Sequence, residues 1–258
     1  MGSPENETGR QPIEQQHTRS INRLLAMSST EVTKRQFKAF TDQPGIRPIS
    51  REKAFHSTTL DSPMLGVPWY EAARFCNWLS QREGIPKHQW CYEPNSDGEY
   101  GPGMKAKDNF WELTGYRLPT ESEWEFAARA GARTSRHFGE TDSLLKSYAW
   151  YGANSKRNSH PAGHLLPNEF GLFDMLGNAY EWCNDLYLDD YPKTENGKKS
   201  VADKIKPKIL YNKDFRVLRG GSFLDRSSTV RSSDRNISFP QEYNHVTGFR
   251  TARTIIAE

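Results

Sequence analysis

The first regular pattern of apolar and polar positions lies in residues 33–40, TKRQFKAF. Thr33 and Gln36 have the spacing of a capping box, in which each side chain satisfies a backbone N–H at the start of a helix. Phe37 and Phe40 follow at a spacing of three, so they share one face of that helix. The pattern predicts a short amphipathic helix with its aromatic face toward the core.

A second helical pattern covers residues 68–84, PWYEAARFCNWLSQREG. Pro68 suits a first helical turn, because its missing N–H has no partner there in any case. Gly84 suits the end of the helix, where the backbone commonly turns left-handed. The apolar face consists of Trp69, Ala72, Ala73, Cys76 and Leu79. We expect this face to be buried.

The third pattern is RLPTESEWEFAARAG, residues 117–131. Thr120 and Glu123 form another capping box, and Gly131 is a plausible C-cap. Trp124, Ala127 and Ala128 supply the apolar stripe. Here too a short helix is predicted.

Outside these helices the chain is rich in turn-forming residues, with 19 Gly and 15 Pro. Brief apolar runs at 216–223, RVLRGGSF, and 248–255, GFRTARTI, predict short strands. The polar residues 1–20 and the lysine-rich stretch 191–208 are expected to be mobile or to lie on the surface. We therefore expect a loop-rich α+β fold with one domain over residues 21–258.

Charge and composition exclude several classes of protein. The net charge is only +3, from 35 basic and 32 acidic residues that are spread along the chain, so no nucleic-acid partner is expected. No apolar run approaches the length of a membrane span, and the N-terminus lacks the apolar core of a signal peptide, so we expect a soluble, cytoplasmic domain without a membrane partner. The three cysteines, Cys76, Cys91 and Cys183, are far apart and do not predict a disulfide framework or a structural zinc site.

Seven motifs in chain order resemble the formylglycine-generating enzyme family, also called the sulfatase-modifying factor family. They are MGSPENETGRQPIEQQH, SSTEVTKRQFKAF, VPWYEAARFCNWLS, GYRLPTESEWEFAARAG, PNEFGLFDMLGNAYEWCND, VLRGGSF and GFRTAR. The resemblance spans nearly the whole chain. It implies a loop-rich variant of the C-type-lectin fold. Bacterial relatives of this kind often sit beside kinase or other signalling modules. We therefore expect this domain to be excised from a longer chain.

The same resemblance identifies the positions of an absent catalytic site. Enzymes of the family carry two cysteines after the RGGSF motif, which bind copper(I) and oxidise a substrate cysteine. Here those positions are Asp225 and Val230. Because copper(I) is held by soft thiolates, neither side chain replaces them, and we expect no copper and no oxidase activity of that type.

Other catalytic patterns are weaker. Family members with a non-heme iron site use a helical His-x3-His-x-Glu motif that this chain lacks, and its nearest pair, His160 and His164, lies in a loop containing Pro161 and Gly163. Ser222 in RGGSF is not in a G-x-S-x-G elbow, so it does not predict a hydrolase. A metal-dependent oxidoreductase with an altered active site stays open as the alternative, and a purely structural module is a third.

The resemblance also implies structural calcium. In the family, oxygen ligands of the segment corresponding to DMLGNAYEWCND hold the ion, as suits a hard cation. Carried over by position, the expected ligands are Asn178, Glu181 and the backbone of Leu176, Gly177 and Tyr180, with a second site near Asn154 and Ser155. The alternative is a tight turn at Gly177 and Asn178 without metal.

The segment after the Gly-Gly turn, 219–236, and the loop before Gly248 are expected to form a shallow surface pocket. Their side chains combine both charges, hydrogen-bond donors and an aromatic face, a mixture typical of recognition sites. We expect Arg219 and Arg250 to tie loops together instead. The candidate ligand-binding residues are Ser222, Asp225, Arg226, Arg231, Asp234, Arg235, Tyr243, Asn244, His245 and Trp182. The sequence thus favours a non-catalytic domain that binds a ligand, peptide or protein.

Overall fold

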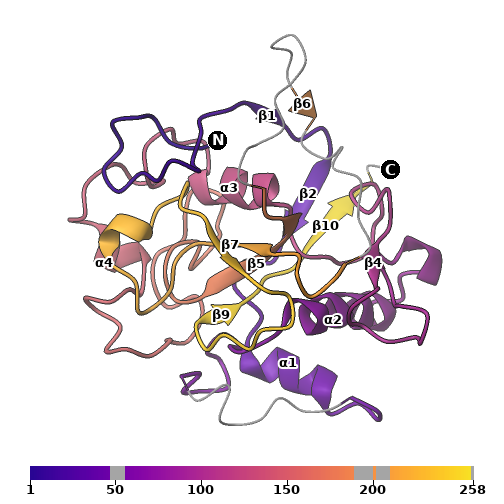
Figure 1. Ribbon diagram of the computed structural model, residues 1–258. Helices are drawn as coiled ribbons and strands as arrows, with labels where there is room; N and C mark the ends of the chain where they lie inside the picture. Colours follow the sequence, from indigo (N-terminus) through magenta and orange to yellow (C-terminus); the bar gives the residue numbers. More distant parts are fainter. Residues whose placement is uncertain (47–55, 189–199, 202–209, 257–258) are drawn as a thin grey trace.

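The computed structural model describes residues 1–46, 56–188, 200–201 and 210–256. At its centre lies a four-stranded sheet in the order β8-β7-β5-β9 (Figure 1). Its strands are β5 (Tyr180–Leu186), β7 (Arg216–Arg219), β8 (Asn236–Ser238) and β9 (Thr247–Gly248). β7 is antiparallel to both of its neighbours, whereas β9 runs parallel to β5.

The two central strands are buried on both faces. Trp182 of β5 pairs with Leu218 of β7, and both side chains are almost completely excluded from solvent. The prediction of a strand at the RVLR stretch is confirmed by β7. The strand over residues 180–186 was missed in favour of an ion-binding loop, because a strand buried on both sides lacks the alternation that marks a half-exposed one.

Three two-stranded pairs surround the sheet. The strands are β1 (Arg19–Ser20) with β6 (Ser200–Val201), β2 (Leu24–Met27) with β10 (Ala252–Ile255), and β3 (Tyr92–Glu93) with β4 (Lys105–Ala106). β10 is the strand expected at the end of GFRTARTI. The shortness of these strands and the long connections between them confirm the loop-rich, mixed α and β fold.

Helices α1 (Lys34–Thr41) and α2 (Trp69–Arg82) lie below the sheet in Figure 1 and meet through aromatic side chains. The Phe37 ring lies 5.3 Å from that of Phe40 and 5.7 Å from that of Phe75. The predicted capping box of α1 is present, and the apolar face of α2 is buried as expected. Pro68 is the N-cap of α2, and Gly84 after its end has φ +72°.

Helix α3 (Glu121–Arg129) lies on the opposite side of the sheet (Figure 1), with the predicted capping box at its start. Its C-cap is Ala130 in the left-handed conformation, one residue before the predicted Gly131. The remaining helical turns are α4 (Leu145–Tyr148), η2 (Lys87–Gln89) and η4 (Ser227–Thr229).

The N-terminal segment, expected to be partly mobile, lies against the α3 side of the molecule (Figure 1). Ser3 and Glu14 are buried, and the backbone N–H of Gly2 donates to Glu125 Oε1 at 2.8 Å. The lysine-rich stretch 191–208 falls almost entirely outside the described residues. Among the residues described, no helix has the length and apolar character to cross a membrane.

Candidate functional site

The two positions that hold copper ligands in the enzymes now lie in different environments. Val230 is completely buried in an apolar cluster with Leu145, Ala149 and Leu176. Asp225 is half-buried at the other end of the turn that contains η4. An isopropyl group in an apolar cluster offers no metal ligand, so Val230 is a core residue.

No cysteine substitutes for the missing pair. Cys76, Cys91 and Cys183 are all free and buried; Cys76 and Cys91 share one core cluster with no copper-site position in it, and Cys183 belongs to another. Burial raises the pKa of Cys91 to about 12 and the pKa values of the other two thiols well above their ordinary range. Buried neutral thiols of this kind are poor nucleophiles and poor copper ligands.

The Asp225 carboxylate is held in a fixed position by two neighbours. The Ser222 N–H donates to Asp225 Oδ2 at 2.8 Å, and the Ser222 hydroxyl donates to the same oxygen. The Tyr180 hydroxyl lies 3.2 Å from Asp225 Oδ1. Burial, and then the Asp225 charge, raise the pKa of Tyr180 above its ordinary value, so its hydroxyl stays protonated and can donate to the carboxylate.

The loop before β9 lies beside the segment that carries this carboxylate, because the Tyr180 N–H donates to the carbonyl of Val246 at 2.9 Å. The His56 ring lies 5.1 Å from the Phe223 ring and 5.3 Å from the His245 ring. Leu224 and Val246 pack on one apolar cluster, which joins the two loops. We call this surface the Asp225 face, and it consists of His56, Leu224, Asp225, Arg226, Tyr243, Asn244 and His245. Burial, and then the neighbouring His56, lower the pKa of His245 below its ordinary value.

Three of the charged residues expected in the pocket are instead buried, which corrects the prediction for Arg231, Asp234 and Arg235. The Arg231 guanidinium donates to both oxygens of Glu14, at 2.7 and 2.8 Å, and also to Glu7. Arg235 donates to both oxygens of Glu121, at 2.6 and 3.1 Å. Because the guanidinium groups of these arginines are already paired with glutamate carboxylates, they are not available to a ligand.

Two further predictions need correction for the same reason. Trp182 is fully buried, and its indole N–H donates to the carbonyl of Val67 at 2.7 Å. Ser222 is buried, and its hydroxyl serves Asp225 rather than a ligand. The expectation that Arg219 and Arg250 tie loops together is confirmed, since Arg219 binds Glu125 and Arg250 binds both oxygens of Glu181.

Side-chain oxygens expected to bind calcium are also engaged within the protein. Asn178 Oδ1 accepts from the His160 N–H at 3.0 Å. The Glu181 carboxylate receives Arg250 and the indole N–H of Trp124, at 2.7 Å. In the expected second site, Asn154 Oδ1 accepts from the Tyr151 N–H at 2.8 Å.

The loop around these residues requires a left-handed backbone conformation at two consecutive positions. Gly177 has φ +74°, and a Cβ there would lie 2.3 Å from the carbonyl oxygen of Trp150. Asn178 is also left-handed, at φ +56°, and Ser155 Oγ donates to the carbonyl of Phe223 at 2.6 Å. The His160 ring stacks on Trp150 at 3.7 Å, so this histidine is a packing residue.

One oxygen cluster next to this loop was missed by the sequence reasoning. Glu31 is completely buried, and its two carboxylate oxygens and Asp174 Oδ1 receive no hydrogen bond from an N–H or hydroxyl group, although the Glu31 and Asp174 carboxyls lie close enough to share a proton. Burial raises the pKa of both carboxyls, and the charges of Asp174 and Glu181 raise that of Glu31 further. Unsatisfied buried carboxylates are rare and costly, so this position suits a bound cation.

The comparison with known proteins accounts for this architecture. The model of the sulfatase-modifying factor enzyme 1-like domain matches residues 1–255. The chain belongs to this family. The sequence-based recognition of a formylglycine-generating enzyme-like domain is thereby confirmed.

Relatives of this sulfatase-modifying factor domain include both enzymes and larger proteins. The formylglycine-generating enzyme of Thermomonospora curvata is 28% identical over 246 residues, 86% of this chain and 79% of the enzyme. The serine/threonine-protein kinase pkn1 of Chlamydia pneumoniae is 29% identical over 194 residues, 75% of this chain. The matched region is only 24% of the kinase, so the chain spans about a quarter of that relative's length.

A solved structure shares the fold over almost the whole chain. Treponema denticola variable protein 1 superimposes with a TM-score of 0.75 and 28% identity, covering 99% of this chain and 94% of that one. The loop-rich mixed fold is therefore that of the sulfatase-modifying factor family.

Proposed function

We propose that this chain is a non-catalytic binding domain of the sulfatase-modifying factor family, with a peptide segment as ligand on the Asp225 face. The observation that carries the proposal is the pair of changes at the copper positions. Val230 is sealed in an apolar cluster, and Asp225 is held by Ser222 and Tyr180 beside exposed polar side chains. The framework around the former reaction centre is kept while the thiolates are absent.

The side chains of the Asp225 face suit recognition of a peptide. Arg226, Tyr243 and His245 are exposed, and Tyr243 shows 47% of its surface to solvent. Aromatic and arginine side chains carry much of the binding energy at protein interfaces. Val230 offers no metal ligand and the Asp225 carboxylate is already bound by Ser222 and Tyr180, which favours this proposal over the alternative of a metal-dependent oxidoreductase.

The match to a kinase supports a proposal about the larger protein context of this domain. There the matching region is a minor part of a signalling protein. We extend the proposal to an interaction module that works in the cytoplasm beside a signalling domain, as part of the same chain or as a separate one.

A phage-displayed library of random dodecapeptides tests the ligand assignment. Peptides selected on the wild-type domain are expected to lose at least about tenfold in affinity for the double variant Arg226→Glu, His245→Glu, because charge and hydrogen-bond complementarity at the face are reversed. Exposed charges elsewhere supply the control, Lys87→Glu with Arg133→Glu. If selected peptides bind the face variant as well as they bind wild type, the Asp225 face is not the site.

We also propose a structural calcium ion at the carboxylates of Glu31 and Asp174, next to Glu181. The support is the set of three buried carboxylate oxygens that receive no hydrogen bond from an N–H or hydroxyl group, together with the preference of Ca²⁺ for oxygen ligands. Burial is the main cause that raises the pKa of both carboxyls, and a bound divalent cation would favour their charged forms. Its contribution would be to hold the segment before α1 against the loop at Asp174.

Replacement of Glu31 by Gln has opposite consequences with and without calcium. In EDTA at pH 8 the variant is expected to melt above wild type, by roughly 3 °C, because it removes a buried charge. With calcium at about a hundred times its Kd, wild type gains about 2.7 kcal/mol and the order reverses. Asp97→Asn, at an exposed position, should melt like wild type in both buffers. Equal calcium-dependent shifts in wild type and Glu31→Gln would contradict the assignment.

A further inference from the structure

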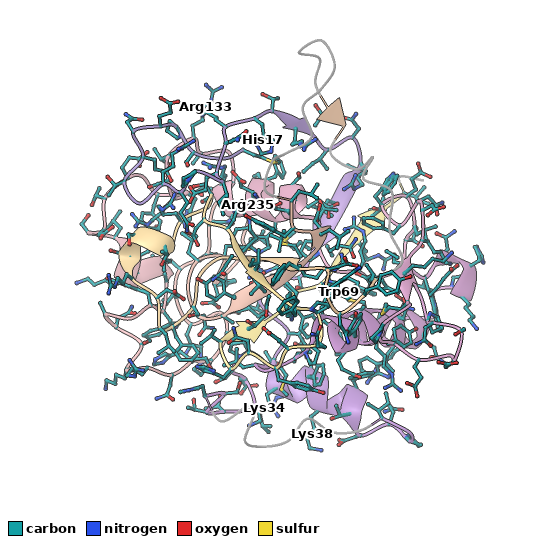
Figure 2. All side chains as sticks on the ribbon, viewed as in Figure 1. His17, Lys34, Lys38, Trp69, Arg133 and Arg235 are labelled. Carbon is teal, nitrogen blue, oxygen red and sulfur yellow. The ribbon has the colours of Figure 1, made fainter. Side chains whose placement is uncertain are left out.

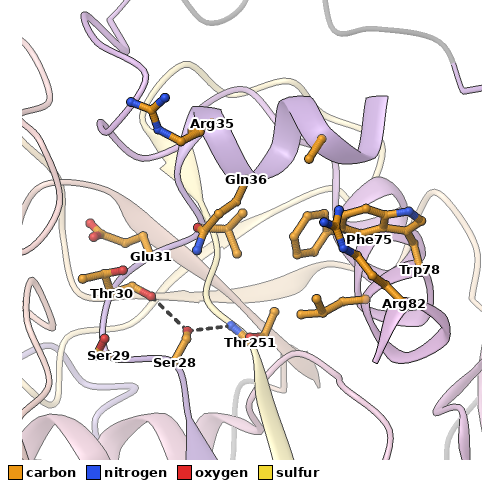
Figure 3. A pocket seen from close by; sticks show the side chains of 13 residues that line it. Ser28, Ser29, Thr30, Glu31, Arg35, Gln36, Phe75, Trp78, Arg82 and Thr251 are labelled. Atoms are coloured by element: carbon orange, nitrogen blue, oxygen red, sulfur yellow. Dashed lines mark hydrogen bonds between the residues drawn. The ribbon is translucent and has the colours of Figure 1, made fainter. Parts of the chain in front are cut away.

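A pocket of about 500 Å³ opens between helix α1, the second half of α2 and the segment that joins β2 to α1 (Figure 3). It is separate from the Asp225 face, and none of the residues of that face lines it. Volumes of this size are typical of sites for small organic ligands. The two sides of the pocket have different chemistry.

One side is aromatic and aliphatic. Phe75, Trp78 and Leu79 of α2 line it, together with Ala39 of α1. Figure 3 shows the rings of Phe75 and Trp78 next to each other on this side, and their centroids are 5.3 Å apart. The Trp78 ring is only partly buried, so a flat apolar ligand could cover its exposed part.

A positively charged side chain lies on this aromatic side. The guanidinium of Arg82 lies 5.4 Å from the Trp78 ring centroid and is directed along the wall in Figure 3. In the described part of the chain no carboxylate pairs with Arg82, whereas the other arginine of the lining, Arg35, is paired with Asp61 at 2.9 Å. Arg82 is therefore the positive charge that the pocket leaves available to an anion.

The opposite side is polar. Ser28, Ser29 and Thr30 line it, and the Ser28 hydroxyl is already used, since it donates to the Thr30 carbonyl at 2.9 Å. Ser29 is exposed and Thr30 half-exposed, which leaves their hydroxyls accessible to a ligand. The Glu31 side chain points away from the aromatic wall in Figure 3, so its charge is not directed at the ligand position.

We propose that this pocket binds a small aromatic carboxylate. The ring would stack against Trp78 and Phe75, the carboxylate would pair with the Arg82 guanidinium, and polar substituents would meet the hydroxyls of Ser29 and Thr30. Charge complementarity selects an anion over a cation, and the flat aromatic wall selects a ring over an alkyl chain. The site is independent of the peptide site proposed above.

Binding of 2-naphthoate, followed by ¹H–¹⁵N NMR of the tryptophan indole groups, tests this site. The acid is expected to bind with a Kd of about 1 mM or tighter and to shift the Trp78 indole resonance, which is assigned by its loss in Trp78→Leu. The neutral 2-naphthamide is expected to bind about fivefold more weakly, because it lacks the charge that Arg82 recognises.

Two variants make the assignment specific. Arg82→Gln should weaken 2-naphthoate by about fivefold, to the level of the amide, without changing the amide's own affinity. Ala39→Leu, which adds side-chain volume to the lining, should abolish the Trp78 shift with either compound. The control is Arg133→Gln, an exposed arginine at the opposite end of the molecule from Lys34 and Lys38 of α1 (Figure 2). Equal affinity for acid and amide, or unchanged binding to Ala39→Leu, would overturn the proposal.

Discussion

Buried arginines determine much of the chemistry of this domain at the scale of single residues. Arg117, Arg219, Arg231 and Arg250 are almost fully buried, and each binds a glutamate that lies far along the chain or in another element. A buried pair of this kind gives little net stability, but removal of one partner is costly because the other charge is left unpaired. Charged residues that the sequence alone would place on a polar surface form ion pairs inside this protein.

Arg231 illustrates why part of the candidate site could not be predicted. Its partners Glu7 and Glu14 are more than two hundred positions away, and no local pattern links them to Arg231. By contrast, Asp225 and Val230 were found by their fixed spacing from the RGGSF motif. The sequence identified which side chains replace the catalytic ones, but it could not tell that Val230 is core and Asp225 half-exposed.

Asp234 gives a prediction for the pH dependence of stability. Burial is the main cause that raises its pKa to about 7. Because the ordinary value is 3.8, ionisation disfavours the folded state, so the stability that Asp234 contributes below pH 4 is lost as the pH rises toward 7. The stability of Asp234→Asn should therefore rise relative to wild type between about pH 4 and 7, by at most about 1.4 kcal/mol per pH unit, and the difference should level off above pH 7.

Thermal unfolding of Asp234→Asn and wild type across this range measures the effect. The exposed Asp97→Asn serves as the control, with a difference from wild type that stays constant. A constant difference for Asp234→Asn as well would show that its carboxyl does not titrate as the structure implies.

At the scale of elements, the three helices with caps were predictable, since their start signals are local. Strand β5 was not, because five of its seven residues are buried and include the polar Glu181 and Asn184. Its place in the sheet depends on pairing with β7 and β9, which lie more than thirty residues away. Helix starts are therefore encoded locally here, while the central sheet depends on contacts between distant segments.

The two capping boxes should differ strongly in importance. In α3, Glu123 caps Thr120 N at 2.8 Å and also pairs with the fully buried Arg117, which holds its pKa at about 2. Glu123→Gln is expected to cost about 3–5 kcal/mol, because Arg117 loses its counter-charge. In α1 the box is exposed, so Gln36→Ala should cost only about 0.5–1 kcal/mol.

Urea unfolding at pH 7 gives the free energy of unfolding of each variant from the midpoint and slope of its transition. Similar costs for the two variants would mean that the Arg117 pair adds nothing beyond a helix cap.

On the scale of the whole molecule, the N-terminal segment packs against residues 231–235, which follow the Gly-Gly turn in the chain. Glu7 and Glu14 meet at Arg231, Gln11 donates to Asp234 at 3.2 Å, and Arg129 donates to the carbonyl of Gly2. These contacts cover residues 231–235, the region that the sequence placed on a surface pocket. The segment thereby keeps residues 231–235 from solvent, whereas the Asp225 face stays accessible.

Loss of the Arg231 charge should release this segment. Arg231→Gln is expected to raise amide hydrogen exchange in residues 1–16 by about tenfold or more, because Glu7 and Glu14 are left buried without a cation. Exchange in α2, which is remote from these contacts, should stay unchanged. Hydrogen exchange followed by mass spectrometry measures both regions in one experiment, and equal protection of residues 1–16 in variant and wild type would contradict this attachment.

The central claim is that the family framework persists here without a copper site, and metal content after anaerobic incubation with copper(I) and dialysis tests it most directly. Inductively coupled plasma mass spectrometry should find less than about 0.1 copper per wild-type chain. The double variant Asp225→Cys, Val230→Cys is the positive control, and it should retain about one copper per chain, since both thiolates are restored. About one copper per wild-type chain would contradict the account and would make the Asp225 face a metal centre.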